Sequence, residues 1–355
     1  MLRESKHRSA AEMLNLYFSD SEEEEEEVGL QAEEVRPRRP RYPLRKVRIT
    51  SGTLDFNERF RLSANKMERI LLSIGNRIEH PPARNHALST KEQLLTTLRW
   101  LGTGAQYHNI GDAQGVSKAS VCRTIKRVVE AINDDLVREY VKWPDNPAGI
   151  AEDFLDEGGM PFVSGCLDRT LIIIDAPVQD EAAYVDRHGN HSIDALLVSG
   201  PDMISYYVLA DWPGNVHDTR VLRNSGLYQR FEGGWHPFPD AIILGDSAYS
   251  LRQWLIPPDT ENPGDVRERR FLRSHKATRR LIESAIGILR EKFPCSNHVR
   301  LDPVAACQVI KCCVTLCKKS KEPDEERPQY QEEENDISDD ETEEEEMDQD
   351  YDADD

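Results

Sequence analysis

Four acidic residues stand in sequence contexts that suit chemistry at a bound cation. Asp246 follows the apolar run AIIL and Gly245, and Asp168 precedes the apolar run LIII. Asp218 lies where the loop WPGNVH enters a predicted helix, and Glu283 lies within the predicted helix RRLIESAIGILREKF. An ionised carboxylate at the end of a buried strand is costly unless something binds it, and the carboxyl ends of strands are where α/β sheets bind ligands.

Carboxylates from separate elements can converge on Mg²⁺ or Mn²⁺, hard cations that prefer oxygen ligands. Two such ions, roughly 3.5 to 4 Å apart, activate a water and stabilise the leaving oxygen in phosphodiester cleavage. The acids therefore favour a metal-dependent nuclease. A metal phosphatase that acts on small phosphoesters is another hypothesis for the same residues.

Two of the acids also have an ordinary structural explanation. Asp218 could cap or complement the N-terminus of its helix. Glu283 shares one side of its helix with three arginines, as an exposed salt-bridged glutamate would. That side of the helix carries Arg279, Arg280, Gly287 and Arg290.

The elements that would position these acids lie in residues 161–321. Strands are predicted in FVSGCLDRTLIIIDAP and AIIL, and a hairpin that turns at residues 200–202 is predicted in DALLVSGPDMISYYVLADWPG. Helices are predicted in NVHDTRVLRNSGLYQRF and RRLIESAIGILREKF. Strands followed by helices, with a parallel crossover near residues 218–245, indicate an α/β domain.

Residues 51–140 have helical periodicity and predict an all-α domain. Ser63 is placed as a helix cap, Ser89 and Glu92 form a capping box, and glycines mark the helix ends. The glycines are Gly75, Gly102 and Gly104. Residues 141–160, which include WPDNPAG and DEGG, are predicted to be a linker.

Within this domain, residues 106–136 predict a helix-turn-helix with its turn at Gly115 and its second helix opened by Ser117. The face of the second helix would carry Lys118, Ser120, Arg123, Lys126 and Arg127. Such a face suits the major groove of DNA. A helical support domain that never touches DNA is the alternative.

The formal charge of −20 is concentrated at the two ends of the chain. Residues 322–355 carry twenty Asp or Glu and one Arg, and residues 19–28 add −7, so residues 29–321 carry +5. The acidic segments 1–34 and 322–355 are predicted to be disordered. Between them, the proline-rich arm of residues 35–50 contains seven Arg or Lys and suits a nuclear localisation signal or phosphate contacts, or else a charge-balancing linker.

Seven cysteines and the lack of a secretory signal favour reduced thiols. Four of them, Cys307, Cys312, Cys313 and Cys317, are predicted to pack on a helix, although zinc binding is an alternative. No stretch is long and apolar enough to predict a membrane span, so no membrane partner is expected.

From about Phe60 to Cys317 the chain resembles the PIF/Harbinger transposases and the nucleases derived from them. Ordered motifs carry the resemblance: FRLSANKMERIL, RWLGTGAQYHNIGDAQGVSKASVCRTI, GCLDRT, YVDRHGNHSIDALLV, WPGNVHDTRVLRNSGL, LGDSAYSLRQWLIPP and RERRFLRSHKATRRLIESAIGILREKF. The resemblance implies a DDE nuclease domain with a ribonuclease H-like fold at residues 161–321. It also implies Asp168, Asp218, Asp246 and Glu283 as ligands of Mg²⁺ or Mn²⁺, with Asp168, Asp246 and Glu283 as catalytic residues.

The chain departs from the family pattern D-G-T-H, because it reads Asp168, Arg169, Thr170 and Leu171. Because of this departure, the alternative function remains a domesticated, catalytically silent nuclear factor that interacts with DNA or protein. For His188 and His191, in the shared motif DRHGNHS, hydrogen bonds that stabilise a loop are expected rather than metal binding. The resemblance further implies DNA and a Myb-like DNA-binding protein as partners. A homo-oligomer is also expected, and the expected location is the nucleus, with the cytoplasm second.

Overall fold

The computed structural model describes residues 54–81, 87–258 and 265–324. Its helices are α2 (Leu54–Phe60), α3 (Ala64–Ile78), α4 (Thr90–Thr103), α5 (Tyr107–Gln114), α6 (Lys118–Asp135), α7 (Val137–Tyr140), α8 (Ala148–Gly158), α9 (Glu181–Tyr184), α10 (Asp218–Arg223), α11 (Gly226–Glu232), α12 (Val266–Lys292), the 3₁₀ helix η1 (Pro294–Asn297) and α13 (Pro303–Lys321). Its strands are β1 (Val163–Ile174), β2 (Ser192–Ser199), β3 (Ser205–Pro213), β4 (Ile242–Leu244), β5 (Leu255–Ile256) and β6 (His298–Val299). The predictions for the segment 1–34, the arm 35–50 and residues 325–355 lie outside the described residues.

The first helices begin where the sequence places their caps. Ser63 accepts a hydrogen bond from the backbone of Lys66, and Ser89 and Glu92 form the predicted capping box of α4. Gly104 ends α4 in a left-handed conformation, with φ of 62°. Gly75 lies near the end of α3, which stops at Ile78, and the C-cap residue Glu79 donates its backbone N–H to Gly75 O.

The predicted pair of helices around Gly115 is present as α5 and α6. Gly115 has φ of 69°, and Ser117 caps α6 by accepting from the backbone of Ser120. Arg127 does not join an outward basic face as predicted, because its guanidinium donates to Gln93 Oε1 at 2.8 Å in a partly buried contact. Whether this pair binds DNA stays a prediction.

The predicted linker at residues 141–160 is instead largely occupied by helix α8. The apolar side of α8 includes Phe154, which is fully buried, and α8 packs against β1 and α12. Gly158 allows this close approach, since a Cβ there would lie 2.9 Å from the Cα of Thr278. The proline and glycine residues that suggested a linker stand at the ends of the helix, and Gly159 ends it in a left-handed conformation.

The sheet mixes parallel and antiparallel strands. Its order is β3-β2-β1-β4-β5; β1 and β3 run antiparallel to β2, while β4 is parallel to β1 and to β5. The β2–β3 hairpin turns where predicted, with Gly200 N donating to Ile204 O at 2.9 Å. This arrangement confirms the prediction of an α/β domain with a parallel crossover.

One edge of β1 is divided between two partners. β4 pairs with β1 from Val163 to Cys166, and β6 pairs in parallel with Ile173 and Ile174. Because β2 occupies the other edge along residues 166–173, β4 and β6 must share this one. Between them, Arg290 of α12 donates to Leu171 O at 3.0 Å and to Thr170 Oγ1 at 2.6 Å. The central part of β1 is thus held on this edge by a side chain of α12.

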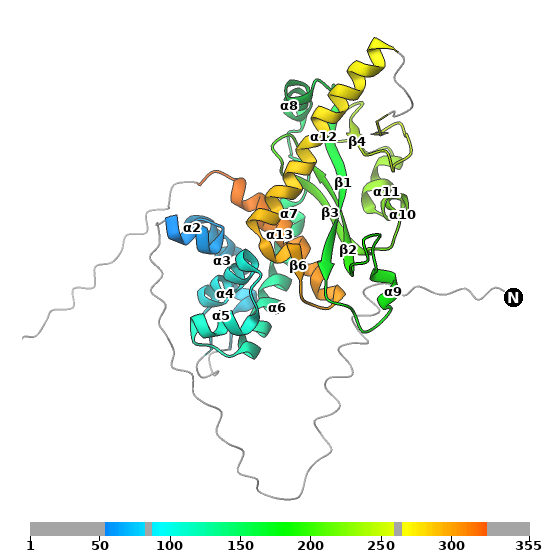
Figure 1. The fold of residues 1–355 in the computed structure, drawn as a ribbon. Helices are drawn as coiled ribbons and strands as arrows, with labels where there is room; N and C mark the ends of the chain where they lie inside the picture. Colours follow the sequence, from blue (N-terminus) through cyan, green and yellow to red (C-terminus); the bar gives the residue numbers. More distant parts are fainter. Residues whose placement is uncertain (1–53, 82–86, 259–264, 325–355) are drawn as a thin grey trace, which may run out of the picture. The chain divides into compact units, whose positions relative to one another are not determined.

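Figure 1 shows α12 running along β1, and α13 lies against β3, α6 and α7. The buried apolar residues form a single cluster that includes side chains from the first helices, the sheet and α13. The four clustered cysteines of α13 are buried, which confirms that they are core residues. None of the described helices is long and apolar enough to span a membrane.

The burial of α8 can be tested by comparing two adjacent positions. Phe154→Ala is expected to lower the free energy of unfolding by about 3–5 kcal/mol, because it removes a fully buried ring. Leu155→Ala is the control, because Leu155 is 46% exposed and its loss should change the free energy by no more than about 0.5 kcal/mol. Urea denaturation measures both. Equal effects at the two positions would contradict the packing of α8.

Candidate active site

Asp168 lies on β1, which is central in the sheet. Its Oδ1 accepts from the backbone N–H of Arg169 at 2.8 Å, and its Oδ2 accepts from Arg279 Nη2 of α12 at 2.9 Å. Burial raises the pKa of Asp168 above the ordinary range for aspartate, and the nearby charge of Asp246 adds to this, whereas Arg279 opposes it. Asp168 is therefore a partly buried carboxylate with a cation on one side and a second acid close by.

Asp246 is brought beside Asp168 by the register of two parallel strands. Cys166 on β1 is aligned with Leu244 on β4, and each aspartate lies two residues beyond this pair. Residues at matching positions of parallel neighbours share a face of the sheet. Oδ1 of Asp246 accepts from the backbone N–H of Ala248 at 3.0 Å, which fixes the turn after the strand. The fold therefore brings the acid that follows β4 to the neighbourhood of Asp168.

Glu283 is connected to Asp168 through Arg279. The Nη1 of Arg279 lies 3.6 Å from Oε1 of Glu283, one helical turn away, while its Nη2 binds Asp168. The side chain of Glu283 is 56% exposed. The arrangement contains the expected salt bridge on the helix surface, and it also places Glu283 near the acids at the sheet.

Asp218 is the first residue of α10 and is held by Arg169. Its Oδ1 lies 2.7 Å from Arg169 Nε in an ion pair. His217 occupies the N-cap position without a side-chain hydrogen bond, so Asp218 is not the cap itself. Its negative charge still lies at the positive end of the helix dipole.

Asp194 on β2 is an acid that sequence reasoning did not single out. Its side chain is 0% exposed, and its Oδ2 accepts from Arg169 Nη1 at 2.6 Å. Burial raises the pKa of Asp194 to about 6, and Arg169 opposes that shift. The only signal in the sequence was an acid inside the otherwise apolar strand SIDALLVS. Its partner could not be inferred, because Arg169 lies 25 positions earlier in the chain.

Arg169 therefore joins three elements. Its guanidinium binds Asp194 on β2, Asp218 on α10 and the carbonyl oxygen of Val216, which accepts at 2.8 Å. Sequence analysis noted Arg169 as a departure from the family pattern but assigned it no contact. In the structure it is the counter-ion of a buried carboxylate and fixes the loop that precedes α10.

Tyr249 is a second residue that sequence reasoning missed. It is buried, and its hydroxyl has no hydrogen-bond partner among the described residues. Burial raises its pKa, and the charges of four acids nearby add to the shift. These acids are Asp218, Asp246, Asp194 and Asp168. The phenol is thus a buried hydroxyl without a hydrogen-bond partner among the described residues, and the charges of these acids act on it.

The donor types at this edge of the sheet suit a hard divalent cation. Asp168 on β1 and Asp246 just beyond β4 could hold such an ion as a pair if Arg279 released Oδ2 of Asp168. Asp218 does not fit as it stands, because Arg169 already binds its carboxylate. Within the described ranges, no three Asp, Glu, His or Cys side chains are grouped closely enough to hold a metal ion together. The roles of Asp168, Asp218, Asp246 and Glu283 as metal ligands stay a prediction.

The two histidines of the motif DRHGNHS lie in a hydrogen-bonded loop. Asp186 Oδ1 accepts from the backbone N–H groups of His188 and Asn190, and His191 Nε2 lies 3.0 Å from Glu181 Oε1. These contacts agree with the expected role in stabilising the loop. Within the described residues, neither histidine belongs to a group that could hold a metal ion.

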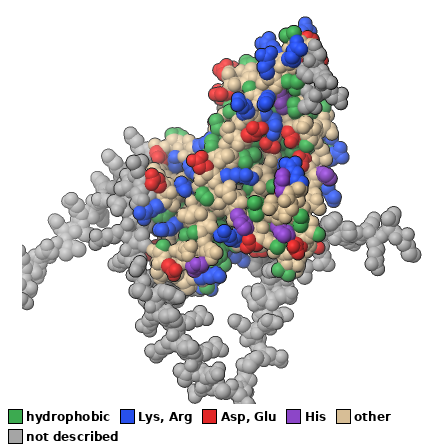
Figure 2. Space-filling model, viewed as in Figure 1, with side chains coloured by type: hydrophobic (Ala, Val, Ile, Leu, Met, Phe, Trp, Pro, Cys, Tyr) green, Lys and Arg blue, Asp and Glu red, His purple; other side chains and the backbone are tan. Residues whose placement is uncertain are grey.

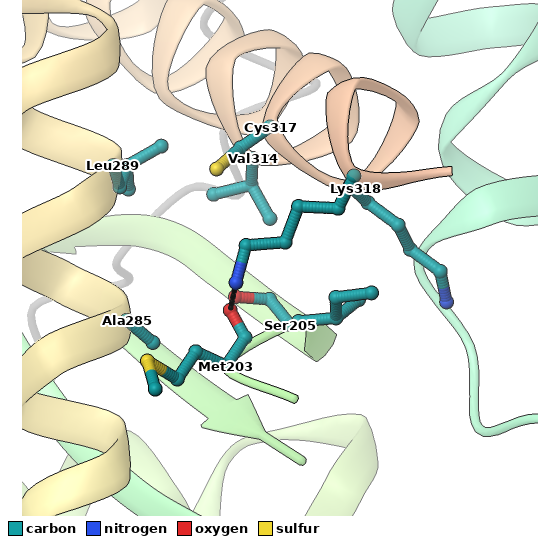
Figure 3. Close-up of a pocket in the computed structure, with 9 residues that line it drawn as sticks. Met203, Ser205, Ala285, Leu289, Val314, Cys317 and Lys318 are labelled. Carbon is teal, nitrogen blue, oxygen red and sulfur yellow. Dashed lines mark hydrogen bonds between the residues drawn. The ribbon is translucent and has the colours of Figure 1, made fainter. Parts of the chain in front are cut away.

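A small pocket between α12, α13 and the start of β3 is separate from the acids (Figure 3). It is lined mostly by apolar side chains, among them Met203, Leu289 and Val314. At its rim the Lys321 amine donates to Met203 O at 3.3 Å. The pocket contains no carboxylate and no histidine, so it does not form part of the candidate active site.

The α/β fold of the sheet and its helices agrees with what comparison with known proteins shows. The pattern of the family described as "DDE superfamily endonuclease" matches residues 167–318, which contain all four acids. The chain belongs to this superfamily, among the PIF/Harbinger transposase-derived proteins. The mixed α/β fold described above fits a DDE nuclease domain.

The relatives come from animals and plants. The chain is 32% identical to the Homo sapiens protein named "Putative nuclease HARBI1", over 68% of this chain and 70% of that one. It is 29% identical to the Xenopus laevis protein of the same name, over 68% and 71% of the two chains. It is 26% identical to the Arabidopsis thaliana "Protein ALP1-like", over 72% and 68%. No solved structure matches the chain.

The ion pair of Arg169 with Asp194 can be tested by a double-mutant cycle. Arg169→Met is expected to lower the free energy of unfolding by about 3–5 kcal/mol, because it leaves Asp194 buried without a counter-ion. Adding Asp194→Leu should recover most of that loss, since no buried charge then remains. Urea denaturation of the two single variants and the double variant measures the coupling.

The matched control is Lys142→Met, which breaks an ion pair with the largely exposed Asp145 and should change the free energy by less than about 1 kcal/mol. If the two substitutions at Arg169 and Asp194 were simply additive, the buried pair would not be the source of the loss.

Proposed function

We propose that the chain is a metal-dependent DNA endonuclease whose sheet is of the ribonuclease H-like kind. The observation that carries the proposal is that Asp168 on β1 and Asp246, which follows the end of β4, each lie two residues beyond the aligned pair Cys166 and Leu244 of two parallel strands. Both aspartates lie inside the region that matches the DDE superfamily endonucleases. The nuclease names of the animal relatives support the same reaction class.

In this proposal Asp168 and Asp246 hold Mg²⁺ or Mn²⁺, and Glu283 completes the catalytic set from α12. The bound cation would supply a water of lowered pKa and would neutralise charge on the phosphodiester. Tyr249 contributes a neutral hydroxyl that is free to donate a hydrogen bond near these oxygens. A version with two ions, in which Asp218 is also a ligand, requires Arg169 to release Asp218.

A second candidate function is a catalytically silent factor that interacts with DNA or protein in the nucleus. The observation that favours it is the occupation of the acids by arginines of the same chain. Arg169 binds Asp218, and Arg279 binds both Asp168 and Glu283. A site that carries its own cations has less need of a metal ion, and it holds an incoming one less tightly.

The remaining expectations are proposals that rest on the family resemblance and on the sequence of the arm 35–50. They are DNA as substrate, a Myb-like DNA-binding partner, self-association and a location in the nucleus with the cytoplasm second. The superfamily match supports a polynucleotide substrate over a small phosphoester.

The endonuclease proposal is tested with supercoiled plasmid and Mn²⁺. The wild-type chain is expected to nick the plasmid, EDTA should abolish nicking, and Asp246→Asn should lower the rate by at least about 100-fold, because it removes a charge from the metal site. Gel electrophoresis of the nicked form measures the rate. Asp156→Asn is the control, since Asp156 is an exposed acid of α8. Nicking that survives Asp246→Asn would assign the activity to other residues or to a contaminant.

The silent candidate is tested through Arg279. Arg279→Gln is expected to tighten Mn²⁺ binding on the order of tenfold, because it frees the Asp168 carboxylate from a cation at 2.9 Å. Isothermal titration calorimetry measures the affinity, and Asp168→Asn in the same background should remove the gain. A chain that binds no Mn²⁺ and nicks no DNA, even with Arg279→Gln, would favour the silent factor.

A further inference from the structure

The first half of α12 carries a row of cations along one side. Arg269, Arg273, Lys276 and Arg280 recur at steps of three or four residues, and all four are exposed. On a helix with 3.6 residues per turn these positions fall within about 60° of one another and extend over about 16 Å. We name this set the α12 basic stripe.

The opposite side of the helix fixes the direction of the stripe. His275, Thr278, Leu281 and Ile282 are buried, and α12 packs on α8 and β1 through that side. The packing leaves the stripe facing solvent. Figure 2 shows Lys and Arg side chains gathered over the upper half of α12 as it is drawn in Figure 1.

The stripe has few acids to neutralise it. Within α12, Glu268 is the only acid before Glu283, and it forms the capping box with Asp265 at the start of the helix. No described residue forms an ion pair with any of the four cations of the stripe. Unlike Arg279, these side chains are therefore available to an external anion.

The stripe ends beside the candidate active site. Arg280 is followed on the same side of α12 by Glu283, and the neighbouring Arg279 binds Asp168. A polyanion that follows the stripe towards Arg280 would therefore arrive next to Arg279 and the Asp168 that it binds.

We propose that the α12 basic stripe binds consecutive phosphates of one DNA strand and guides that strand to Asp168 and Asp246. The choice of DNA as the polyanion rests on the proposed function. The charge balance agrees with it, because the negative charge of the chain lies mainly in residues 19–28 and 322–355, while residues 29–321 carry +5. Arginine and lysine bind the phosphate backbone without reading its sequence, so the contact should be independent of DNA sequence.

The test measures DNA binding without cleavage. The full chain is titrated onto a fluorescent 20-bp duplex in EDTA at salt concentrations from 50 to 200 mM, and anisotropy gives the affinity. The stripe variant combines Arg269→Gln, Arg273→Gln, Lys276→Gln and Arg280→Gln. Its slope of log affinity against log salt should be smaller in magnitude than that of the wild type by about 3 to 4, or about 0.9 for each lost phosphate contact. The affinity of the wild type should drop over this salt range by about 100-fold more than that of the variant.

The control variant removes the same charge at four dispersed exposed positions, Lys91→Gln, Arg138→Gln, Arg187→Gln and Arg300→Gln. It should keep most of the wild-type slope. Equal slopes for the two quadruple variants would overturn the proposal, because only net charge would then matter. Circular dichroism melting curves check that both variants remain folded.

Because EDTA prevents cleavage, this result is separable from the proposed function. The salt slopes report DNA binding whether or not the wild type nicks plasmid, and the exposed-acid control Asp156→Asn should bind DNA as the wild type does. An alternative occupant of the stripe is the acidic segment 325–355 of the chain itself. If a peptide of that sequence bound the wild type but not the stripe variant, while both bound DNA equally, the proposal for DNA would be overturned.

Discussion

The arrangement of the acids at the candidate active site depends on the ion pair of Arg169 with Asp194. A carboxylate with no access to solvent remains charged only if a cation lies against it, because transfer of an isolated charge out of water is very costly. The guanidinium that meets this need has further donors, and it uses them on Asp218 and on the carbonyl of Val216. One buried charge thereby fixes the start of α10 relative to β1 and β2.

Arg279 repeats this arrangement at the surface of α12, where it lies between Asp168 and Glu283. Of the four predicted acids, Asp246 is the one that forms no ion pair with a described residue. The turn after β4 holds it in place, because its Oδ1 accepts from the backbone N–H of Ala248. The site is therefore not a purely acidic pocket. A divalent cation would have to compete with a guanidinium for Asp168, whereas Asp246 is accessible to it from the start.

Sequence reasoning succeeded where structure is decided locally. Ser63, Ser89 and Ser117 cap their helices, because a cap needs only the residues of the first turn. Asp246 follows a strand, as the apolar run AIIL and Gly245 predict. Sequence reasoning failed where the position of an element or side chain depends on a partner that is distant in the chain. Phe154 makes α8 a core helix only because β1 and α12 cover it, and Arg127 turns inward because Gln93, 34 positions away, accepts its hydrogen bond.

The same distinction explains the site. The ends of strands and the start of α10 were evident from the sequence, and all four carboxylates stood out by their context. Asp194 and Tyr249 were missed because each has its significance only through groups on other elements. Glu283 was assigned as a metal ligand only through resemblance to a family, since its helical spacing alone predicted the salt bridge that the structure also contains.

The divided edge of β1 bears on how such chains can diverge. β4 leaves the edge near Cys166, and the chain returns to it as β6 only after β5 and α12. Extra residues inserted after β5 would lengthen this excursion without altering either strand pairing or the alignment of Cys166 with Leu244. Homologous proteins could thus gain or lose whole segments at this point while the spacing between Asp168 and Asp246 remained unchanged.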